Sequence, residues 1–158
     1  MPIHFRPIRP DDKAELVHAL GRLSMETVHK RFLAAKPGFS TAELRYLTEV
    51  DGHDHLAHVA VDDDGDIVAV ARCVRDRAHP ESAEFAIVVG DALHHHGIGS
   101  ALTRDLASAA LAVGITRFTA TMLPDNEAPR RLMAHVGSQV TDDHFEGGLR
   151  EVAVDLAT

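Results

Sequence analysis

The sequence has few or none of several residue types, and each absence excludes a class of protein. Cys73 is the single cysteine, so an internal disulfide framework is excluded. No apolar run approaches the roughly 20 residues of a membrane-spanning helix, and no charged and then apolar leader opens the chain. We therefore expect a cytoplasmic protein with no membrane partner.

Basic residues are also few, because 16 lysines and arginines stand against 24 aspartates and glutamates, for a formal charge of −8. Nucleic-acid-binding proteins usually carry a basic face, so no nucleic-acid partner is expected. A cationic amine substrate suits an acidic protein better. With 45% apolar residues, the chain can bury a core, and we expect a single domain over residues 1–158.

The most informative segment covers residues 83–114, AEFAIVVGDALHHHGIGSALTRDLASAALAVG. Its apolar first part predicts a strand, and Gly97-Ile98-Gly99 opens an amphipathic helix. A helix N-terminus presents unpaired N–H groups and the positive end of the helix dipole, and glycine permits close approach. The pattern predicts a site for a phosphate-bearing cofactor.

Two common nucleotide-binding motifs do not fit this segment. A Rossmann fingerprint requires a third glycine, where this chain has Leu102, and an acidic residue about 20 positions further on. A P-loop requires Gly-Lys-Ser/Thr at the helix start, and no lysine lies near Gly99. Dinucleotide and nucleoside triphosphate binding are therefore not expected.

Periodicity and turn signals predict an α/β fold along the whole chain. The Asp-Gly turn at residues 63–66 predicts a hairpin, and the strand ending at Val89 is connected through the glycine-opened helix to a parallel strand starting at Arg117. Ligands bind at the carboxyl ends of parallel strands, where this glycine loop lies. The expected strands are residues 3–9, 56–61, 67–74, 81–89, 117–122, 138–144 and 149–156, and the expected helices are residues 10–20, 24–34, 40–50, 97–113 and 126–136.

Two motifs resemble the GNAT superfamily of acyl-CoA N-acyltransferases. His94-His95-His96-Gly97-Ile98-Gly99 resembles the pyrophosphate loop Arg/Gln-x-x-Gly-x-Gly/Ala, with His94 at the usual Gln or Arg position. Asn126 and Gly137 resemble the family's Asn…Tyr-x-x-x-Gly helix, with Met133 at the tyrosine position. The resemblance implies the GNAT fold, a mixed and mostly antiparallel sheet of about six to seven strands flanked by about four helices.

Three further segments are similar to the catalytic domain of Pat-type bacterial protein lysine acetyltransferases. They are ETVHKRF (26–32), AELRYLTEVDGHD (42–54) and AEFAIVV (83–89). The resemblance implies an N-acetyltransferase that uses acetyl-CoA as cosubstrate, with a protein lysine as acceptor and attack within a ternary complex. A small-amine acetyltransferase and a non-catalytic acyl-CoA-sensing module remain alternatives, and a homodimer through the C-terminal strands is compatible with the family.

The resemblance also implies site residues. For the pyrophosphate they are His94, His95, His96, Gly97, Ile98, Gly99 and Ser100, for the thioester oxygen and pantetheine the main chain of Ile87, Val88 and Val89, and for the pantetheine Asn126. Each has a simpler interpretation. The glycines open a helix, the strand residues form core, and Asn126 caps the following helix.

Glu84 is the candidate general base, because it interrupts an apolar strand at the family's base position. A lysine amine has a pKa of about 10.4, so a base is useful at neutral pH. We expect Glu84 to be partly buried, with a raised pKa, and to act through water because Val88 lies roughly 13 Å along the strand. A solvated glutamate on an exposed strand face is the alternative.

Other reactive residues are expected to have no catalytic or metal-binding role. The 12 histidines include His94–His96 and a group at residues 51–58, but neither spacing converges on one ion, so no metal is expected. Histidines beside a pyrophosphate predict tighter CoA binding at pH of about 6 than at about 8. Cys73 is expected in the core rather than as an acyl carrier, and Met133 leaves the thiolate without a dedicated acid.

Overall fold

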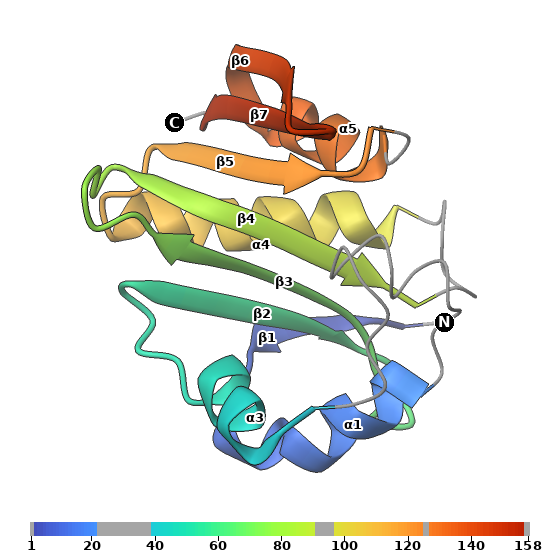
Figure 1. The fold of residues 1–158 in the computed structure, drawn as a ribbon. Helices are drawn as coiled ribbons and strands as arrows, with labels where there is room; N and C mark the ends of the chain where they lie inside the picture. Colours follow the sequence, from blue (N-terminus) through green and yellow to red (C-terminus); the bar gives the residue numbers. More distant parts are fainter. Residues whose placement is uncertain (1, 22–38, 91–96, 125–126, 157–158) are drawn as a thin grey trace.

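The computed structural model describes residues 2–21, 39–90, 97–124 and 127–156, and these form a seven-stranded sheet with helices on both faces (Figure 1). The strand order is β1-β2-β3-β4-β5-β7-β6, and every neighbouring pair is antiparallel except β4 and β5. The strands are β1 His4–Pro7, β2 His55–Val61, β3 Ile67–Arg75, β4 Ser82–Val89, β5 Arg117–Met122, β6 Gly137–Glu146 and β7 Leu149–Leu156. The described helices are η1 Pro10–Asp12, α1 Lys13–Gly21, α3 Thr41–Thr48, α4 Ile98–Ala112 and α5 Glu127–Val136.

These elements confirm the fold class and most element positions predicted from the sequence. The single parallel crossover runs from β4 through α4 to β5, as the glycine-opened helix indicated. The predicted hairpin joins β2 to β3, where Gly65 adopts φ of +84° and Asp62 accepts N–H bonds from Asp64 and Asp66. The helix expected over residues 24–34 lies outside the described residues.

Two apolar clusters lie on the two faces of the sheet. On the face that we name the α4 face, α4 and α5 pack against the strands through residues such as Leu102, Leu106 and Met133. On the opposite face, named the α3 face, α1 and α3 pack through Leu16, Leu44 and Leu47. Figure 1 shows α1 and α3 together beside the β1–β3 half of the sheet. None of the described helices is long and apolar enough to cross a membrane.

Candidate active site

β4 and β5 separate after three residue pairs, and the opening between them is named here the fork. Ser82, Ala83 and Glu84 pair with Arg117, Phe118 and Thr119. Beyond Glu84 the two strands continue to Val89 and Met122 without further pairing between them, and Figure 1 shows them diverging. β4 keeps its antiparallel pairing with β3 through Val89, without a register shift. Among the described residues, no strand pairs with this side of β4 beyond Glu84.

The direction of the main chain decides which β4 groups face the fork. The N–H of Gly90 donates to Val68 in β3, whereas the carbonyl of Glu81 accepts from Thr116 and Arg117 at the start of β5. Main-chain groups of alternate residues point to the same neighbour. The N–H of Ile87 therefore points into the fork and that of Val88 points toward β3. Of the three strand residues predicted to bind the thioester and pantetheine, Ile87 and Val89 therefore have main-chain N–H groups directed into the fork, and Ile87 lies nearer its base.

The first turn of α4 lies at the mouth of the fork. Gly97 is the N-cap with φ of +78°, no side chain of the described residues caps the helix, and its first turn contains no acidic residue. A Cβ on Gly99 would lie 3.5 Å from the Val89 side chain and 3.3 Å from that of Leu132 in α5. Glycine at this position thus allows the helix start to approach the end of β4. The N–H groups of Ile98, Gly99 and Ser100 lack intrahelical partners in any α-helix.

Several residues predicted for the cofactor site have no described position. His94, His95 and His96 and also Asn126 lie outside the described residues, so their predicted contacts remain predictions. Gly97, Ile98, Gly99 and Ser100 are described, and they lie together at the start of α4. The structure thus brings the glycine segment and β4 together from positions separated by a linker in the sequence.

Glu84 is the last residue of β4 that pairs with β5. The expectation that its side chain is buried is wrong, because it is exposed between the buried Ala83 and Phe85. Strand alternation turns those two neighbours to the α4 face and Glu84 to the α3 face. It lies there in one row with Val74 of β3 and Thr119 of β5. Its carboxylate is solvent-accessible at the base of the fork.

A buried polar pair on the same face was missed by the sequence analysis. Arg72 of β3 is 7% exposed, and its Nη1 donates to the carbonyl oxygen of Leu47 at 3.1 Å and to Nε2 of His55 at 3.0 Å. His55 is 9% exposed, and burial followed by the charge of Arg72 lowers its pKa to about 4. The imidazole is therefore neutral at pH 7. The signal in the sequence was an arginine inside the apolar run IVAVARCVR.

The chemistry of three further residues follows from their burial. Cys73 is fully buried and desolvation raises the pKa of its thiol to about 12, so it carries no thiolate at neutral pH. Met133, at the family's tyrosine position, is also fully buried. Tyr46, by contrast, is 56% exposed, and its ring centroid lies 4.8 Å from that of His55.

Carboxylates cluster on the exposed β6–β7 hairpin. His144 Nδ1 lies 2.8 Å from Asp142, and its Nε2 lies 3.0 Å from Glu151 and 3.6 Å from Glu146. The hydrogen bond to Asp142 is the largest cause of a raised His144 pKa. His144 pairs with Glu151, and Glu151 pairs with Thr121 of β5. Alternation from Glu84 and Thr119 places these residues on the α3 face.

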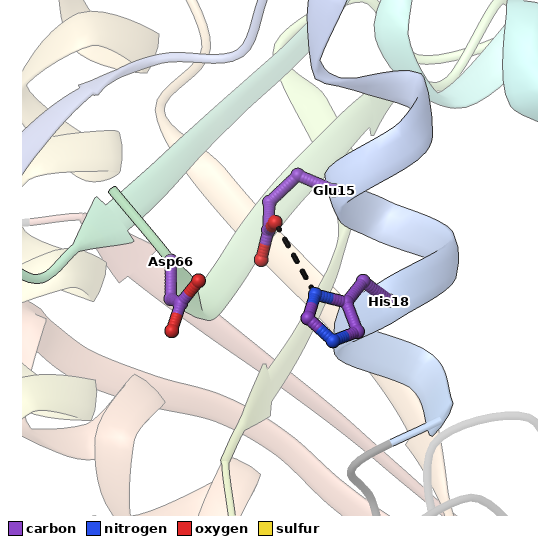
Figure 2. Close-up of side chains that lie close together, drawn as sticks. All are labelled: Glu15, His18 and Asp66. Atoms are coloured by element: carbon purple, nitrogen blue, oxygen red, sulfur yellow. Dashed lines mark ion pairs between the residues drawn. The ribbon is translucent and has the colours of Figure 1, made fainter. Parts of the chain in front are cut away.

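Three groups of described residues bring possible metal ligands within 4.8 Å of one another. They are Glu15, His18 and Asp66, then His144, Glu146 and Glu151, then Asp62, Asp64 and Asp66. Figure 2 shows the first group, in which Glu15 and His18 of α1 face Asp66, the residue before β3. Glu15 Oε2 and His18 Nδ1 lie 3.6 Å apart. Exposed groups of this kind are common on acidic proteins without an ion.

The histidine group at residues 51–58 does not converge. Asp51 accepts hydrogen bonds from the main-chain N–H groups of His53, Asp54 and His55, and these lower its pKa to about 2. His55 lies on the α3 face with Arg72, whereas His58 reaches Asp105 of α4 at 2.6 Å on the opposite face. Strand alternation thus places the two side chains on opposite faces of the sheet.

Known proteins with the same sequence pattern and fold identify the family. Residues 25–137 match the acetyltransferase (GNAT) family model. The acetyltransferase Pat of Mycolicibacterium smegmatis is 37% identical over 136 residues, which cover 85% of this chain and 40% of that protein. The chain thus spans about two fifths of the length of this relative.

Solved structures give the same result. The GNAT domain of S. lividans PAT has a TM-score of 0.88 and 30% identity, covering 98% of this chain and 90% of that one. The structure of yncA from Salmonella typhimurium with acetyl-CoA shares the fold at a TM-score of 0.75 and 17% identity, with 98% and 94% coverage. Because the family model covers well over half of its residues, the chain belongs to the GNAT family of acetyltransferases.

Proposed function

We propose that this domain transfers acetyl from acetyl-CoA to a primary amine, with a protein lysine as acceptor, by direct attack within a ternary complex. The observation that carries the proposal is the fork between β4 and β5, which opens directly beside the first turn of α4. A fork provides main-chain donors for an extended thioester arm, and a helix N-terminus provides donors for phosphate. Membership of the GNAT family supports the same reaction.

In this proposal acetyl-CoA spans the α4 start and the fork. The N–H groups of residues 98–100 bind the pyrophosphate, with His94, His95 and His96 beside it. The pantetheine arm lies along β4 next to Asn126, and the N–H of Ile87 donates to the thioester oxygen. The structure of yncA, which shares this fold, contains acetyl-CoA, and this supports the same class of donor.

The chemical step then follows from the groups around the fork. The acceptor nitrogen attacks the thioester carbon, and the Ile87 N–H stabilises the negative oxygen of the tetrahedral intermediate. The new C–N bond remains and the C–S bond breaks. A thiol pKa of about 8.5 makes the thiolate a tolerable leaving group without a dedicated acid, and the thiolate then takes a proton from solvent. The amine proton passes through water to Glu84. Met133 has no part in proton transfer.

A lysine-bearing acceptor fits the charge of the α3 face. Glu84 is exposed at the fork, and Asp142, Glu146 and Glu151 surround His144 on the neighbouring hairpin. These carboxylates give that side of the fork a negative potential, which attracts cationic chains. Similarity over most of this chain to the acetyltransferase Pat supports acetyl transfer as the reaction.

Calorimetric titration with acetyl-CoA tests the donor site, with a charge placed at the α4 start. Ser100→Glu is the suitable variant, because Gly97 has a positive φ and any substitution there also strains the backbone. An acidic side chain in the first helical turn favours the helix but repels a pyrophosphate. We expect at least about tenfold weaker binding for Ser100→Glu, and near-parental binding for the neutral control Ser100→Gln.

Thiol release distinguishes the acceptor classes. The domain is incubated with acetyl-CoA and either a library of lysine-containing peptides or a panel of small amines, and free CoA thiol is measured. Thiol release with peptides supports the proposal. Thiol release with small amines alone identifies a small amine, rather than a protein lysine, as the acceptor. Tight acetyl-CoA binding without release with any amine identifies a sensing module, and absence of binding overturns the proposal.

A further inference from the structure

The C-terminal end of α3 is capped by a side chain from the sheet. The carbonyl of Leu47 lies in the last turn of α3, where carbonyl groups have no intrahelical N–H partner. Nη1 of Arg72 donates to this carbonyl at 3.1 Å. A guanidinium at this position also favours the negative end of the helix dipole. Arg72 thus joins α3 to the middle of β3.

His55 completes the arrangement as a hydrogen-bond acceptor. Its Nε2 accepts from Arg72 at 3.0 Å, so its Nδ1 carries the proton in the neutral ring. Tyr46 of α3 packs over the same ring at 4.8 Å. The next residue but one, Thr48, is 1% exposed and bonds the carbonyl of Leu44. The end of α3 is therefore fixed both to the guanidinium and to the imidazole.

The contact of Arg72 with His55 and the end of α3 lies beside the fork. His55 pairs with Val74, and Val74 pairs with Glu84, so these three residues form one row across β2, β3 and β4. At about 4.8 Å between strands, His55 lies roughly 10 Å from Glu84 on the same face. Arg72 pairs with Ala86, the second β4 residue beyond the last β4–β5 pair. Any movement of the α3 end displaces the exposed Tyr46 relative to Glu84.

We propose that Arg72 and His55 are positioning residues for the amine acceptor, because they hold the end of α3 and the ring of Tyr46 at the side of the fork where Glu84 is exposed. This inference rests on the proposed acetyltransferase function. Arg72 and His55 act through α3 and make no contact with acetyl-CoA, whose proposed site lies at α4 and along the fork. Their loss therefore changes the apparent affinity for the acceptor and leaves donor binding intact.

The test compares two substitutions at His55 with a neighbouring control. His55→Leu removes the acceptor atom for Arg72, whereas His55→Gln supplies a side-chain oxygen, and His53→Leu alters an exposed histidine on the adjoining loop. KM for the best acceptor peptide, kcat, and Kd for acetyl-CoA are measured on protein shown to be folded by circular dichroism. We expect His55→Leu to raise the peptide KM at least about fivefold with kcat and Kd within about twofold of the parent. His55→Gln and His53→Leu stay near the parent.

Arg72→Lys keeps the inference testable should His55→Leu not fold. Lysine retains the charge but lacks the planar guanidinium group that reaches both Leu47 and His55. It is expected to raise the peptide KM about threefold without changing acetyl-CoA affinity. An unchanged peptide KM in every folded variant, or a parallel loss of donor affinity, overturns the positioning role. A parent that acetylates no amine overturns the proposed function and this inference together.

Discussion

Glu84 combines exposure with a fixed place at the base of the fork. Its main chain pairs with both β3 and β5, so the backbone that carries the carboxylate is held in place although the side chain is exposed to solvent. We predict that Glu84→Gln lowers kcat at least about tenfold, because general-base catalysis contributes about a hundredfold or more. Affinity for acetyl-CoA should not change, because the amide retains the size of the side chain. Steady-state kinetics and calorimetry measure the two effects.

The matched control for Glu84 is Glu81→Gln, since Glu81 is also exposed and precedes β4 directly. Its carbonyl pairs with β5, but its side chain lies at the far end of the parallel pairing from the fork. It should keep parental kcat. Equal rates for the Glu84 and Glu81 variants would remove Glu84 from the reaction.

His55 predicts a specific pH dependence of stability. Its folded pKa is lowered from 6.5 to about 4, so between these values the unfolded chain binds more protons. The stability linked to its neutral form is complete above pH of about 6.5 and is lost as the pH falls toward 4. The loss is on the order of 3 kcal/mol at most. Urea unfolding of the parent and of His55→Gln across this range measures it.

The glutamine variant should show a flatter profile over the same pH range. His144, whose pKa is raised, acts with the opposite sign, since stability from its protonated form is lost as the pH rises through that pKa. This contribution is common to the parent and the variant. Identical profiles for the two proteins would therefore show that burial of His55 does not control this titration.

At the residue scale, the sequence identified candidate residues better than it predicted the burial and partners of their side chains. Glu84 stood out because it interrupts an apolar strand, but its exposure depends on which face of the sheet α3 covers, which no local pattern specifies. Arg72 and His55 were missed because their partners lie 25 and 17 positions away in the sequence. Contacts of that range arise from the topology of the sheet rather than from periodicity.

At the element scale, periodicity was sufficient for most of the fold. β5 and β7 have the boundaries that the sequence predicted, and the Asp-Gly turn correctly joined β2 to β3. The place where β4 and β5 separate could not be read from the sequence, because apolar residues continue through both paired and unpaired parts of β4. The main-chain alternation that favours Ile87 over Val88 likewise required the hydrogen-bond pattern.

Gly137 tests the packing of the C-terminal elements. A Cβ at this position would lie 2.9 Å from the Asp155 carbonyl oxygen, 3.0 Å from the Val154 Cβ and 3.1 Å from the Met133 carbonyl oxygen. These are mainly backbone atoms, so α5 or β7 must move. Overpacking of this kind costs about 1–3 kcal/mol, and we predict that Gly137→Ala lowers Tm by roughly 3–10 °C.

Gly99→Ala is the comparison for Gly137→Ala, since the atoms nearest to its added Cβ belong to the side chains of Leu132 and Val89, at 3.3 and 3.5 Å. Side-chain ends move more easily than backbone, so its Tm should fall less. Thermal unfolding followed by circular dichroism measures both variants. A larger loss for Gly99→Ala would show that α4, rather than the C-terminal strands, has the tighter packing.

At the scale of the whole molecule, the net charge of −8 is distributed unequally around the fork. The exposed carboxylates of Asp142, Glu146 and Glu151 share one histidine. Arg130 and Arg150, in contrast, both pair with Asp143. Composition predicted an affinity for cations, but only the strand register shows that this charge lies on the face that carries Glu84.

This charge distribution predicts that salt weakens binding of the lysine acceptor more than binding of acetyl-CoA. Ions shorten the range of surface charges from about 10 Å at 0.1 M to about 3 Å at 1 M. Raising NaCl from about 0.05 to about 0.5 M should therefore raise KM for a cationic lysine peptide severalfold. Acetyl-CoA is an anion, and screening its repulsion by the acidic protein should leave its Kd unchanged or lower.

The double variant Glu146→Gln, Glu151→Gln isolates the contribution of the hairpin to this salt effect. It removes two negative charges from the α3 face, and the pairing of β6 with β7 and of β7 with β5 is made by main-chain hydrogen bonds. Its peptide KM should be higher than that of the parent at low salt and should converge with it at high salt, because screening removes the same attraction. Parallel KM curves at all salt concentrations would place the cation-attracting charge elsewhere on the molecule, away from the β6–β7 hairpin.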